Sequence, residues 1–404
     1  MKNKLAFLSL IFAGGILFAQ GQLFQFKYKE GDAYRVLSTV QEDVFFNDVF
    51  HHHAEILNRV SVRVTGIDDK GRGIHDAIFM TSENSTGARG GVFTYGEDYK
   101  SVFARDAAGR YDISDEYFMP VVRDVPIFPA EEIEVGHKWT AQGHEAHDLR
   151  RTFDIKTPYK IPFNAEYEYL GEVQEEGKTF YKFDVQYEME YSVDMKKFNF
   201  VKGEVPVATQ GYSHQIIWWD NDKGCIDHYR EEFRIEILTS SNNILRFEGT
   251  AHAEVTDFAR TADEKNVAAV IEKINDLGID DVSVTAGEKG LTLSIENIQF
   301  KPDSDILLQS ERAKLDKIAQ ILNAYPDNDL LITGHTALRG TKESRQKLSE
   351  ERAQAVANYL IRKNVRDKYH VFTKGMGGDV PIADNSTEAG RAKNRRVEIT
   401  IMDK

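Results

Sequence analysis

The sequence predicts a multidomain protein in which β-rich, sandwich-like modules at the amino-terminal side precede an α/β domain. Three observations support this fold class. The chain has 404 residues, which is more than one hydrophobic core usually serves. Apolar and polar residues alternate with a period of two from about residue 22 to 258, a pattern typical of half-buried strands. From Thr261 onward a helical period replaces this alternation, and strand and helix patterns then follow each other.

The composition is that of a globular protein, and it limits the classes of partner. Hydrophobic residues make up 41% and charged residues 29% of the chain, and the formal net charge is -14. Nucleic acid is not an expected partner, because phosphate binding needs clustered lysine and arginine side chains. Cys225 is the only cysteine, so an intramolecular disulfide is excluded. The sequence has no phosphate-cradling loop and no dinucleotide fingerprint, so we expect no cofactor.

Residues 1–19 have the pattern of a cleaved signal peptide. Lys2 and Lys4 precede an apolar run over 5–18, which is shorter than the roughly 20 residues that a membrane-spanning helix needs. Ala19 supplies a small residue where cleavage would occur. We therefore expect the mature protein to be exported.

The β-rich region is expected to form two domains, 20–140 and 141–258. In the second, apolar residues at alternate positions from Phe183 to Tyr191 are separated by acidic and amide side chains. Three of the nine prolines lie close together, at Pro120, Pro126 and Pro129. Because proline is excluded from central strands, this cluster predicts the boundary between the two domains. The spacing of the turns in the second domain suits a β-sandwich.

The last domain is expected over 259–404, with its core at 296–404. Thr261-Ala262-Asp263-Glu264 reads as a capping box at the start of a leading helix, and a hairpin over 282–295 follows that helix. In the core, Ser349 is the expected N-cap of the second helix.

Three ordered motifs occur between residues 334 and 398. They are the turn Gly334-His335-Thr336 after a short apolar strand, the segment Leu348-Ser349-Glu350-Glu351-Arg352-Ala353, and an ending from Asn385 through Asn394-Arg395-Arg396 to Glu398. Together these motifs resemble the OmpA-like (OmpA/MotB carboxy-terminal) peptidoglycan-binding domain family. The resemblance implies a β-α-β-α-β-β fold that binds the stem peptide of peptidoglycan. It also implies a cell-envelope protein, located in the periplasm or associated with the outer membrane.

The same resemblance implies a binding site. The family has an Asp directly after the Gly-His-Thr turn, which binds the ammonium group of a diamino acid, and the Arg of the second motif binds its carboxylate. This chain has Arg352 at the second position but Ala337 at the first, and it has Arg345 where the family usually has Asn. The other positions expected to line the site are Asp303, Thr336 and Arg395.

The substitution at Ala337 changes the predicted function. Loss of one hydrogen bond to a charged group removes about 1.5–3 kcal/mol, which is roughly ten- to hundredfold in affinity. Arg339 and Arg345 add positive charge near the cleft, which repels an ammonium group and favours an anion. We therefore predict a non-enzymatic envelope protein with a divergent domain whose peptidoglycan binding is weakened or lost. The domain would then act as a structural or interaction module.

Two alternatives stay open. The domain could retain binding through Arg352, Asp303, Thr336 and Arg395, as a tether that links the outer membrane or an envelope complex to the cell wall. The protein could instead be an envelope hydrolase that uses the β-rich region, although His144-Glu145-x-His147 lacks the helical spacing of zinc hydrolases. No catalytic or metal-binding residue is predicted. In the preferred interpretation the β-rich modules bind another envelope component, and peripheral membrane association is one form that this contact could take.

Overall fold

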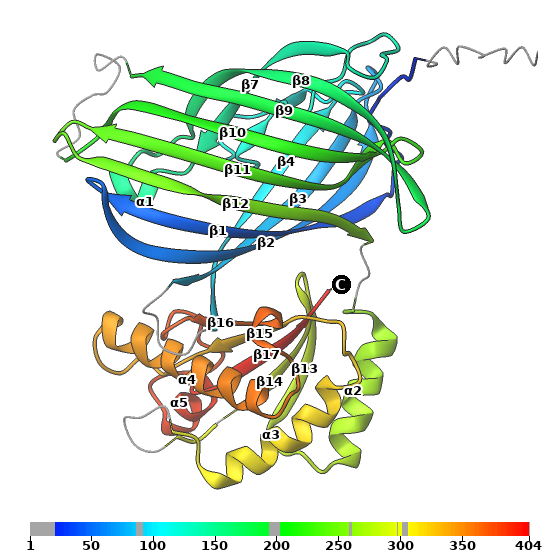
Figure 1. Ribbon diagram of the computed structural model, residues 1–404. Helices are drawn as coiled ribbons and strands as arrows, with labels where there is room; N and C mark the ends of the chain where they lie inside the picture. The colour runs from blue at the N-terminus through cyan, green and yellow to red at the C-terminus, as the bar shows by residue number, and fades with distance from the viewer. Residues whose placement is uncertain are drawn as a thin grey trace, which may run out of the picture.

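The computed structural model describes residues 21–85, 92–193, 203–257, 261–296, 298–300 and 306–403. It has a large β-rich amino-terminal region and a carboxy-terminal α/β domain, which lies below that region in Figure 1. The β-rich and α/β character predicted for the two parts of the chain is therefore confirmed. The expected signal peptide, 1–19, and the expected boundary at 258/259 lie outside the described residues. In the part of the chain that the structure describes, no helix combines the length and the apolar character needed to cross a bilayer.

Long strands account for most of the described amino-terminal region, together with the short helix α1 (Arg150–Phe153). The strands are β1 (Ala33–Phe46), β2 (Val49–Ile67), β3 (Gly73–Ser85), β4 (Phe93–Arg105), β5 (Tyr111–Ile113), β6 (Val122–Arg123), β7 (Lys138–His147), β8 (Tyr159–Glu175), β9 (Lys178–Ser192), β10 (Pro206–Asp220), β11 (Cys225–Thr239) and β12 (Ile244–Asp257). In β9 the buried residues Phe183, Val185, Tyr187 and Met189 alternate with polar residues, as the sequence predicts.

These strands form one antiparallel sheet in the order β5-β4-β3-β2-β1-β12-β11-β10-β9-β8-β7, with β6 beside β7. β1 pairs with β2 along one side and with β12 along the other, which joins the two ends of the region. The predicted boundary between 140 and 141 falls inside β7, so the structure has a single sheet where two sandwich-like modules were expected. The three clustered prolines lie between β5 and β7, where they interrupt strand pairing, and β7 then returns to the same sheet.

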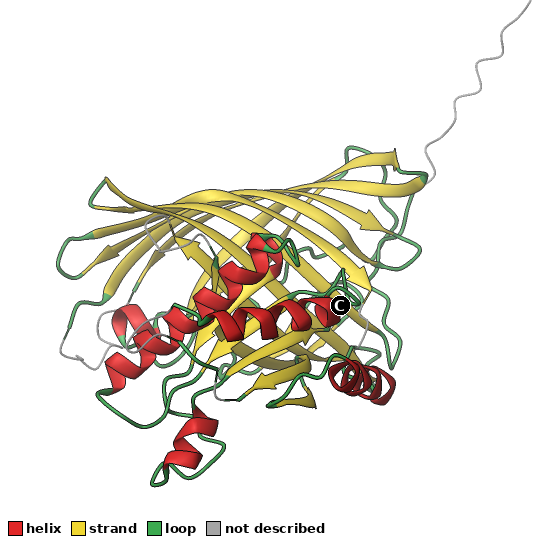
Figure 2. Ribbon diagram, turned by 90° about the horizontal axis from the view of Figure 1, so that it is seen from below, coloured by secondary structure: helices red, strands yellow, loops and turns green. Residues whose placement is uncertain are grey.

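The sheet is strongly curved, as Figure 2 shows, and an aromatic core lies on its inner face. Phe24 and Phe128, which lie outside the long strands, pack against Phe183 of β9 and Trp219 of β10. The ring centroids are 4.9 Å apart between Phe24 and Phe183 and 4.7 Å apart between Phe128 and Trp219. Edge-to-face contacts of this kind add about 0.5–1.5 kcal/mol each beyond the burial of the rings. The segments around Phe24 and Phe128 therefore fill part of the inner face.

The carboxy-terminal domain combines a five-stranded sheet with helices. Its elements are α2 (Glu264–Asp276), β13 (Val282–Gly287), β14 (Gly290–Ile295), α3 (Gln309–Leu322), β15 (Leu330–Gly334), α4 (Lys342–Arg362), the 3-10 turn η2 (Lys368–His370), β16 (Val371–Gly375), α5 (Glu388–Asn394) and β17 (Val397–Met402). The strand order is β13-β14-β17-β15-β16, in which β15 and β16 are parallel and the other pairs antiparallel. From β14 to β17 the expected β-α-β-α-β-β order is present, with α5 as an addition that the sequence did not predict.

The leading helix α2 begins differently from the prediction. Asp263, not Thr261, is the N-cap, and its side chain accepts a hydrogen bond from the Asn266 amide at 2.7 Å. The Thr261 amide instead donates to Asp403 Oδ1 at 2.7 Å. Thr261 therefore fixes the start of the domain to the carboxy-terminal end of the chain, a contact that a local capping pattern does not reveal.

The two parts of the molecule share a buried interface. The start of β4 pairs in parallel with β16, so β4 reaches down to the carboxy-terminal sheet in Figure 1. One apolar cluster spans the interface and includes Leu57, Met80, Phe93, Tyr95, Leu331, Phe372 and Met402. Beside it, Arg59 Cζ lies 4.1 Å from the ring centroid of Phe372, and Arg59 Nε lies 2.5 Å from Asp329 Oδ2. The side chains of this ion pair are only 9% and 8% exposed, so the pair is buried.

His370 completes the interaction at Asp329, with Nδ1 2.7 Å from Asp329 Oδ1. Burial alone would raise the pKa of Asp329, but the His370 hydrogen bond and the charge of Arg59 outweigh burial and hold this pKa below its usual value. The same hydrogen bond raises the pKa of His370 above its ordinary value of 6.5. The interface is therefore built around an ionised Asp329 that pairs with Arg59 and is hydrogen-bonded to His370.

Arg59→Ala should destabilise the protein by about 3–5 kcal/mol, because the Asp329 carboxylate stays buried without its arginine partner. Urea unfolding followed by circular dichroism measures the change. Lys100→Ala is the matched control, since Lys100 pairs with Glu288 at 3.2 Å across the same two parts but the two side chains are 61% and 75% exposed. Loss of such an exposed pair should cost about 1 kcal/mol or less. Equal losses in the two variants would contradict the importance of the buried pair.

The contribution of His370 should decline by less than about 1 kcal/mol between about pH 6 and pH 9. Its pKa is raised in the folded protein, so the contribution is complete below the unfolded pKa of 6.5 and is lost as pH rises through the folded value. The His370 side chain is 51% exposed, which keeps the effect small. The measurement is the difference in unfolding free energy between the unchanged chain and His370→Gln across this range. A difference that stays constant with pH would show that the charge of His370 makes no contribution.

Candidate functional site

The loop 335–340 between β15 and α4 carries two of the predicted site positions, and three other segments hold it in place. The His335 amide donates to Arg396 O at 3.0 Å, and the Thr336 amide donates to Gly377 O at 2.7 Å. The Leu338 amide donates to Asn385 Oδ1 at 3.0 Å. These contacts connect the loop to the residue before β17, to the segment after β16 and to the segment before α5. The loop is therefore built from residues that are far apart in the sequence.

A partly buried carboxylate supports the base of this loop. His335 is 3% exposed, and its Nε2 lies 3.4 Å from Glu398 Oε2, while Arg396 Nε donates to Glu398 Oε1 at 2.8 Å. Burial alone would raise the pKa of Glu398, but His335 and Arg396 together lower it to about 2. Glu398 is therefore ionised at neutral pH. Both His335 and Glu398 belong to the sequence motifs, but their contact across two strands could not be read from the motifs.

Ala337 places a methyl group at the position where the resemblance implies a carboxylate. The residue is 6% exposed, and its neighbour Leu338 is 50% exposed. Thr336 is 7% exposed, and its hydroxyl oxygen is buried without a hydrogen-bond partner in the described structure. This part of the loop therefore presents apolar groups and one hydroxyl group, and Ala337 contributes no acceptor for a cation.

The helix that carries Arg345 and Arg352 starts earlier than predicted. α4 begins at Lys342, and Thr341 is its N-cap, because the Thr341 side chain accepts a hydrogen bond from the Ser344 amide at 3.2 Å. Ser349 therefore lies within the helix and has a different function. Its hydroxyl group donates to Gln346 O at 2.7 Å and accepts from the Gly377 amide at 2.9 Å. Ser349 thus fixes α4 to the segment after β16, which also binds Thr336.

The two arginines of α4 lie in different surroundings. Arg345 Nη1 donates to Gly340 O at 2.7 Å, so this guanidinium group is attached to the end of the loop 335–340. Arg352 Cζ lies 4.9 Å from the ring centroid of Phe300, close enough for a cation–π contact. The structure therefore attaches Arg345 to the end of the loop that carries Thr336 and Ala337, and it places Arg352 on the same helix against Phe300.

Arg395, another of the predicted positions, is engaged in an ion pair at α5. Arg395 Nη2 pairs with Glu388 Oε1 at 2.8 Å, and Arg391 pairs with the same carboxylate at 2.9 Å. Asp303 lies outside the described residues. The neighbouring Asn394 is 1% exposed and accepts a hydrogen bond from the Ile382 amide at 2.8 Å. The end of the third motif therefore closes the fold at α5 and β17, and its participation in binding stays a prediction.

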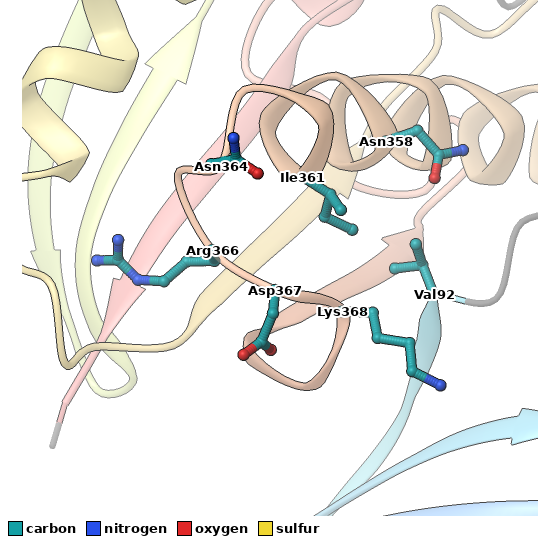
Figure 3. A pocket seen from close by; sticks show the side chains of 7 residues that line it. All are labelled: Val92, Asn358, Ile361, Asn364, Arg366, Asp367 and Lys368. Carbon is teal, nitrogen blue, oxygen red and sulfur yellow. The ribbon is translucent and has the colours of Figure 1, made fainter.

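A separate hollow lies at the other end of α4, and Figure 3 shows the side chains around it. Its volume is about 580 Å³, and its lining residues are Val92, Asn358, Ile361, Asn364, Arg366, Asp367 and Lys368. Arg366 is 9% exposed and donates to the carbonyl oxygens of Asn328 at 2.9 Å and Leu322 at 3.1 Å. Its guanidinium group therefore fixes the end of α3 and the next turn. The hollow contains none of the predicted site residues.

The histidines of the β-rich region form no metal site among the described residues, where no group of three or more potential ligands occurs. His147 Nε2 lies 2.6 Å from Glu145 Oε2, whereas His144 Nδ1 lies 3.5 Å from Asp124 Oδ2. The two histidines of the His144-Glu145-x-His147 segment therefore contact different carboxylates.

Comparison with known proteins assigns this part of the chain. Residues 299–395 match the OmpA family. The chain is 48% identical over 69 residues to outer membrane protein A of Bordetella avium, and 46% identical over 70 residues to the peptidoglycan-binding protein ArfA of Mycobacterium tuberculosis. Each match covers 17% of this chain. An outer membrane protein structure from Borrelia burgdorferi matches 30% of this chain and 96% of its own, with 43% identity and a TM-score of 0.25.

The family match lies in the carboxy-terminal part of the chain. The chain spans 35% of the Bordetella relative and 21% of the Mycobacterium relative. The matched range contains α3, β15, α4, β16 and α5, and the loop and the two arginines described above lie within it. The chain therefore consists of a large β-rich amino-terminal region followed by an OmpA family domain at residues 299–395.

Proposed function

We propose that this is a non-enzymatic cell-envelope protein whose OmpA-like domain binds the ordinary stem peptide of peptidoglycan only weakly. The observation that carries the proposal is the buried methyl group of Ala337 in the loop after β15. The resemblance implies that an Asp at this position binds the ammonium group of the stem peptide. Without that carboxylate, affinity should be lower by roughly ten- to hundredfold.

The neighbouring carboxylates support this proposal because each is already paired with an arginine. Glu398 is bound by His335 and Arg396, and Glu388 is bound by Arg391 and Arg395. Recruiting either carboxylate to an ammonium group would break an existing ion pair. A ligand that lacks an ammonium group, or that presents an anion toward Arg345, fits the loop better.

A working cell-wall tether is the alternative, and Arg352 favours it. This arginine occupies the family position for the ligand carboxylate, and its planar group suits such a partner. The Mycobacterium relative is also named as a peptidoglycan-binding protein. In this alternative the chain would link the outer membrane or an envelope complex to the cell wall.

The proposed location is the periplasm or the outer membrane, after export. The amino-terminal pattern over 1–19 is that of a signal peptide, and the Bordetella relative is named as an outer membrane protein. The β-rich region would then bind a second component of the envelope, while the OmpA-like domain faces the cell wall.

Ala337→Asp should strengthen binding of the full chain to purified peptidoglycan by roughly ten- to hundredfold, because it restores an acceptor for the ammonium group. The measurement is pelleting with insoluble peptidoglycan over a series of protein concentrations. Adding Arg352→Ala to this variant should abolish the gain, since the ligand carboxylate loses its partner. Arg362→Ala is the matched control, because Arg362 is an exposed arginine at the far end of α4. It should leave binding unchanged.

The opposite pattern would support the tether. If the unchanged chain pellets as strongly as Ala337→Asp, and Arg352→Ala alone prevents pelleting, the site works without the carboxylate. The proposal of weakened binding would then be wrong.

A further inference from the structure

The inner face of the β-rich sheet carries two separate cores. The aromatic core described above lies mainly on β8, β9 and β10. A smaller core on β2, β3 and β4 contains Val62, Ala77 and Phe103. In the sheet order, β1 and β12 lie between the strands of these two cores. Figure 1 shows β3 and β4 behind β10, β11 and β12, so this part of the face is turned toward the inside of the curved sheet.

Side chains between the two cores face the same side as the cores but are not fully buried. Tyr34 packs against the smaller core, and the period of two in β1 places Val36, Val40 and Glu42 on the same face as Tyr34. In the neighbouring strand β2, Ile56 pairs with Val40. All four of these residues are only half-buried, and neither core contains them. Apolar side chains of the inner face are therefore accessible between the two cores.

Small residues on β12 stand beside these side chains, and Ala251 and Ala253 among them are buried. Phe247 packs against the aromatic core, and alternation places Gly249, Ala251 and Ala253 on the same face. Val40 pairs with Ala251, and Glu42 pairs with Gly249. The side chains of β1 therefore stand beside residues too short to cover them.

Arg105 of β4 lies beside the smaller core, near the Tyr111 ring, but the charged side chains between the two cores are acidic on this face. Glu42 of β1 and Glu83 of β3 both lie on it, since Glu83 pairs with Ile56. Glu231 of β11 lies on it as well, where Ser213 Oγ donates to its Oε1 at 2.6 Å. Among the described residues on this face of β1, β2, β11 and β12, none is a lysine or an arginine. Burial, with a smaller effect of the Glu83 charge, raises the pKa of Glu42 to about 7. A cation beside Glu42 would relieve this cost of ionisation.

We propose that this face binds an amphiphile with an apolar chain and a primary ammonium head. The apolar chain would lie against Val36, Val40 and Ile56, where it removes half-exposed aliphatic side chains from water. The ammonium head would lie between Glu42 and Glu83, which supply carboxylate acceptors. This site is independent of the OmpA-like domain and of its ligand.

The test uses the full chain and dodecylamine as the probe, measured by isothermal titration calorimetry below the micelle concentration and above the Glu42 pKa of about 7. One dodecylamine should bind per chain. Glu42→Gln should weaken binding about tenfold, because it removes one charge-assisted hydrogen bond. Glu254→Gln is the matched control, since Glu254 is exposed on the opposite face of β12.

A bulky residue on the inner face should prevent binding. Val40→Trp should weaken it more than tenfold because the larger ring occupies the surface that the apolar chain would cover, whereas Thr250→Trp on the outer face should have no effect. Thermal unfolding followed by circular dichroism shows whether each variant folds, and Ser38→Phe replaces Val40→Trp if the latter does not. The proposal is overturned if dodecylamine does not bind, if dodecanoate or dodecanol binds equally well, or if the inner-face variants bind like their controls.

Discussion

The pairing of β1 with both β2 and β12 is the constraint on which the rest of the structure depends. It joins strands from the two ends of the β-rich region, so the strands between them curve around a common interior. The same register turns Val36, Val40 and Glu42 toward that interior. It turns Arg35 to the other face, where the guanidinium group donates to the Asp403 carbonyl oxygen in the carboxy-terminal domain. A slip by one residue would exchange the two faces. It would turn Glu42 away from the interior and remove the contact between Arg35 and Asp403.

Strand type could be predicted from the sequence, but strand partners could not. Alternation in β9 is a local pattern, and the structure has that strand with its apolar residues buried. The pairing of β1 with β12 joins distant segments, and no local pattern specifies it. The proline cluster indicated only where strand pairing is interrupted. It lies between β5 and β7 and does not mark the end of a domain. The predicted start of α4 was wrong for a related reason. Thr341 and Ser349 are both acceptable N-cap residues, and the structure uses Thr341 as the N-cap while Ser349 binds the Gly377 amide.

The candidate site could likewise be predicted only in part from the sequence. Thr336, Ala337 and Arg352 were found because they belong to short motifs, and the structure places them on the expected loop and helix. The residues that hold the loop in place were not found, because their partners come from other segments. Ser349 and Glu398 are members of the motifs, yet their contacts with Gly377 and His335 need the folded sheet. The position of Asp303 stays a prediction, since it lies outside the described residues.

The contact between the β-rich region and the carboxy-terminal domain covers the edge strand of the carboxy-terminal sheet and does not cover Leu338 of the candidate loop. β16 is the edge strand of that sheet, and an unpaired edge is open to pairing with other chains. β4 covers this edge by pairing with Phe372 and Thr373, and the buried Arg59 and Asp329 stabilise the contact nearby. At the end of β16, Gly375 accepts a hydrogen bond from Gln346 of α4 at 2.8 Å, and the chain then reaches the segment that binds Thr336. Leu338 in that loop stays 50% exposed. The β-rich region therefore contacts the domain along its sheet edge and leaves Leu338 of the loop exposed.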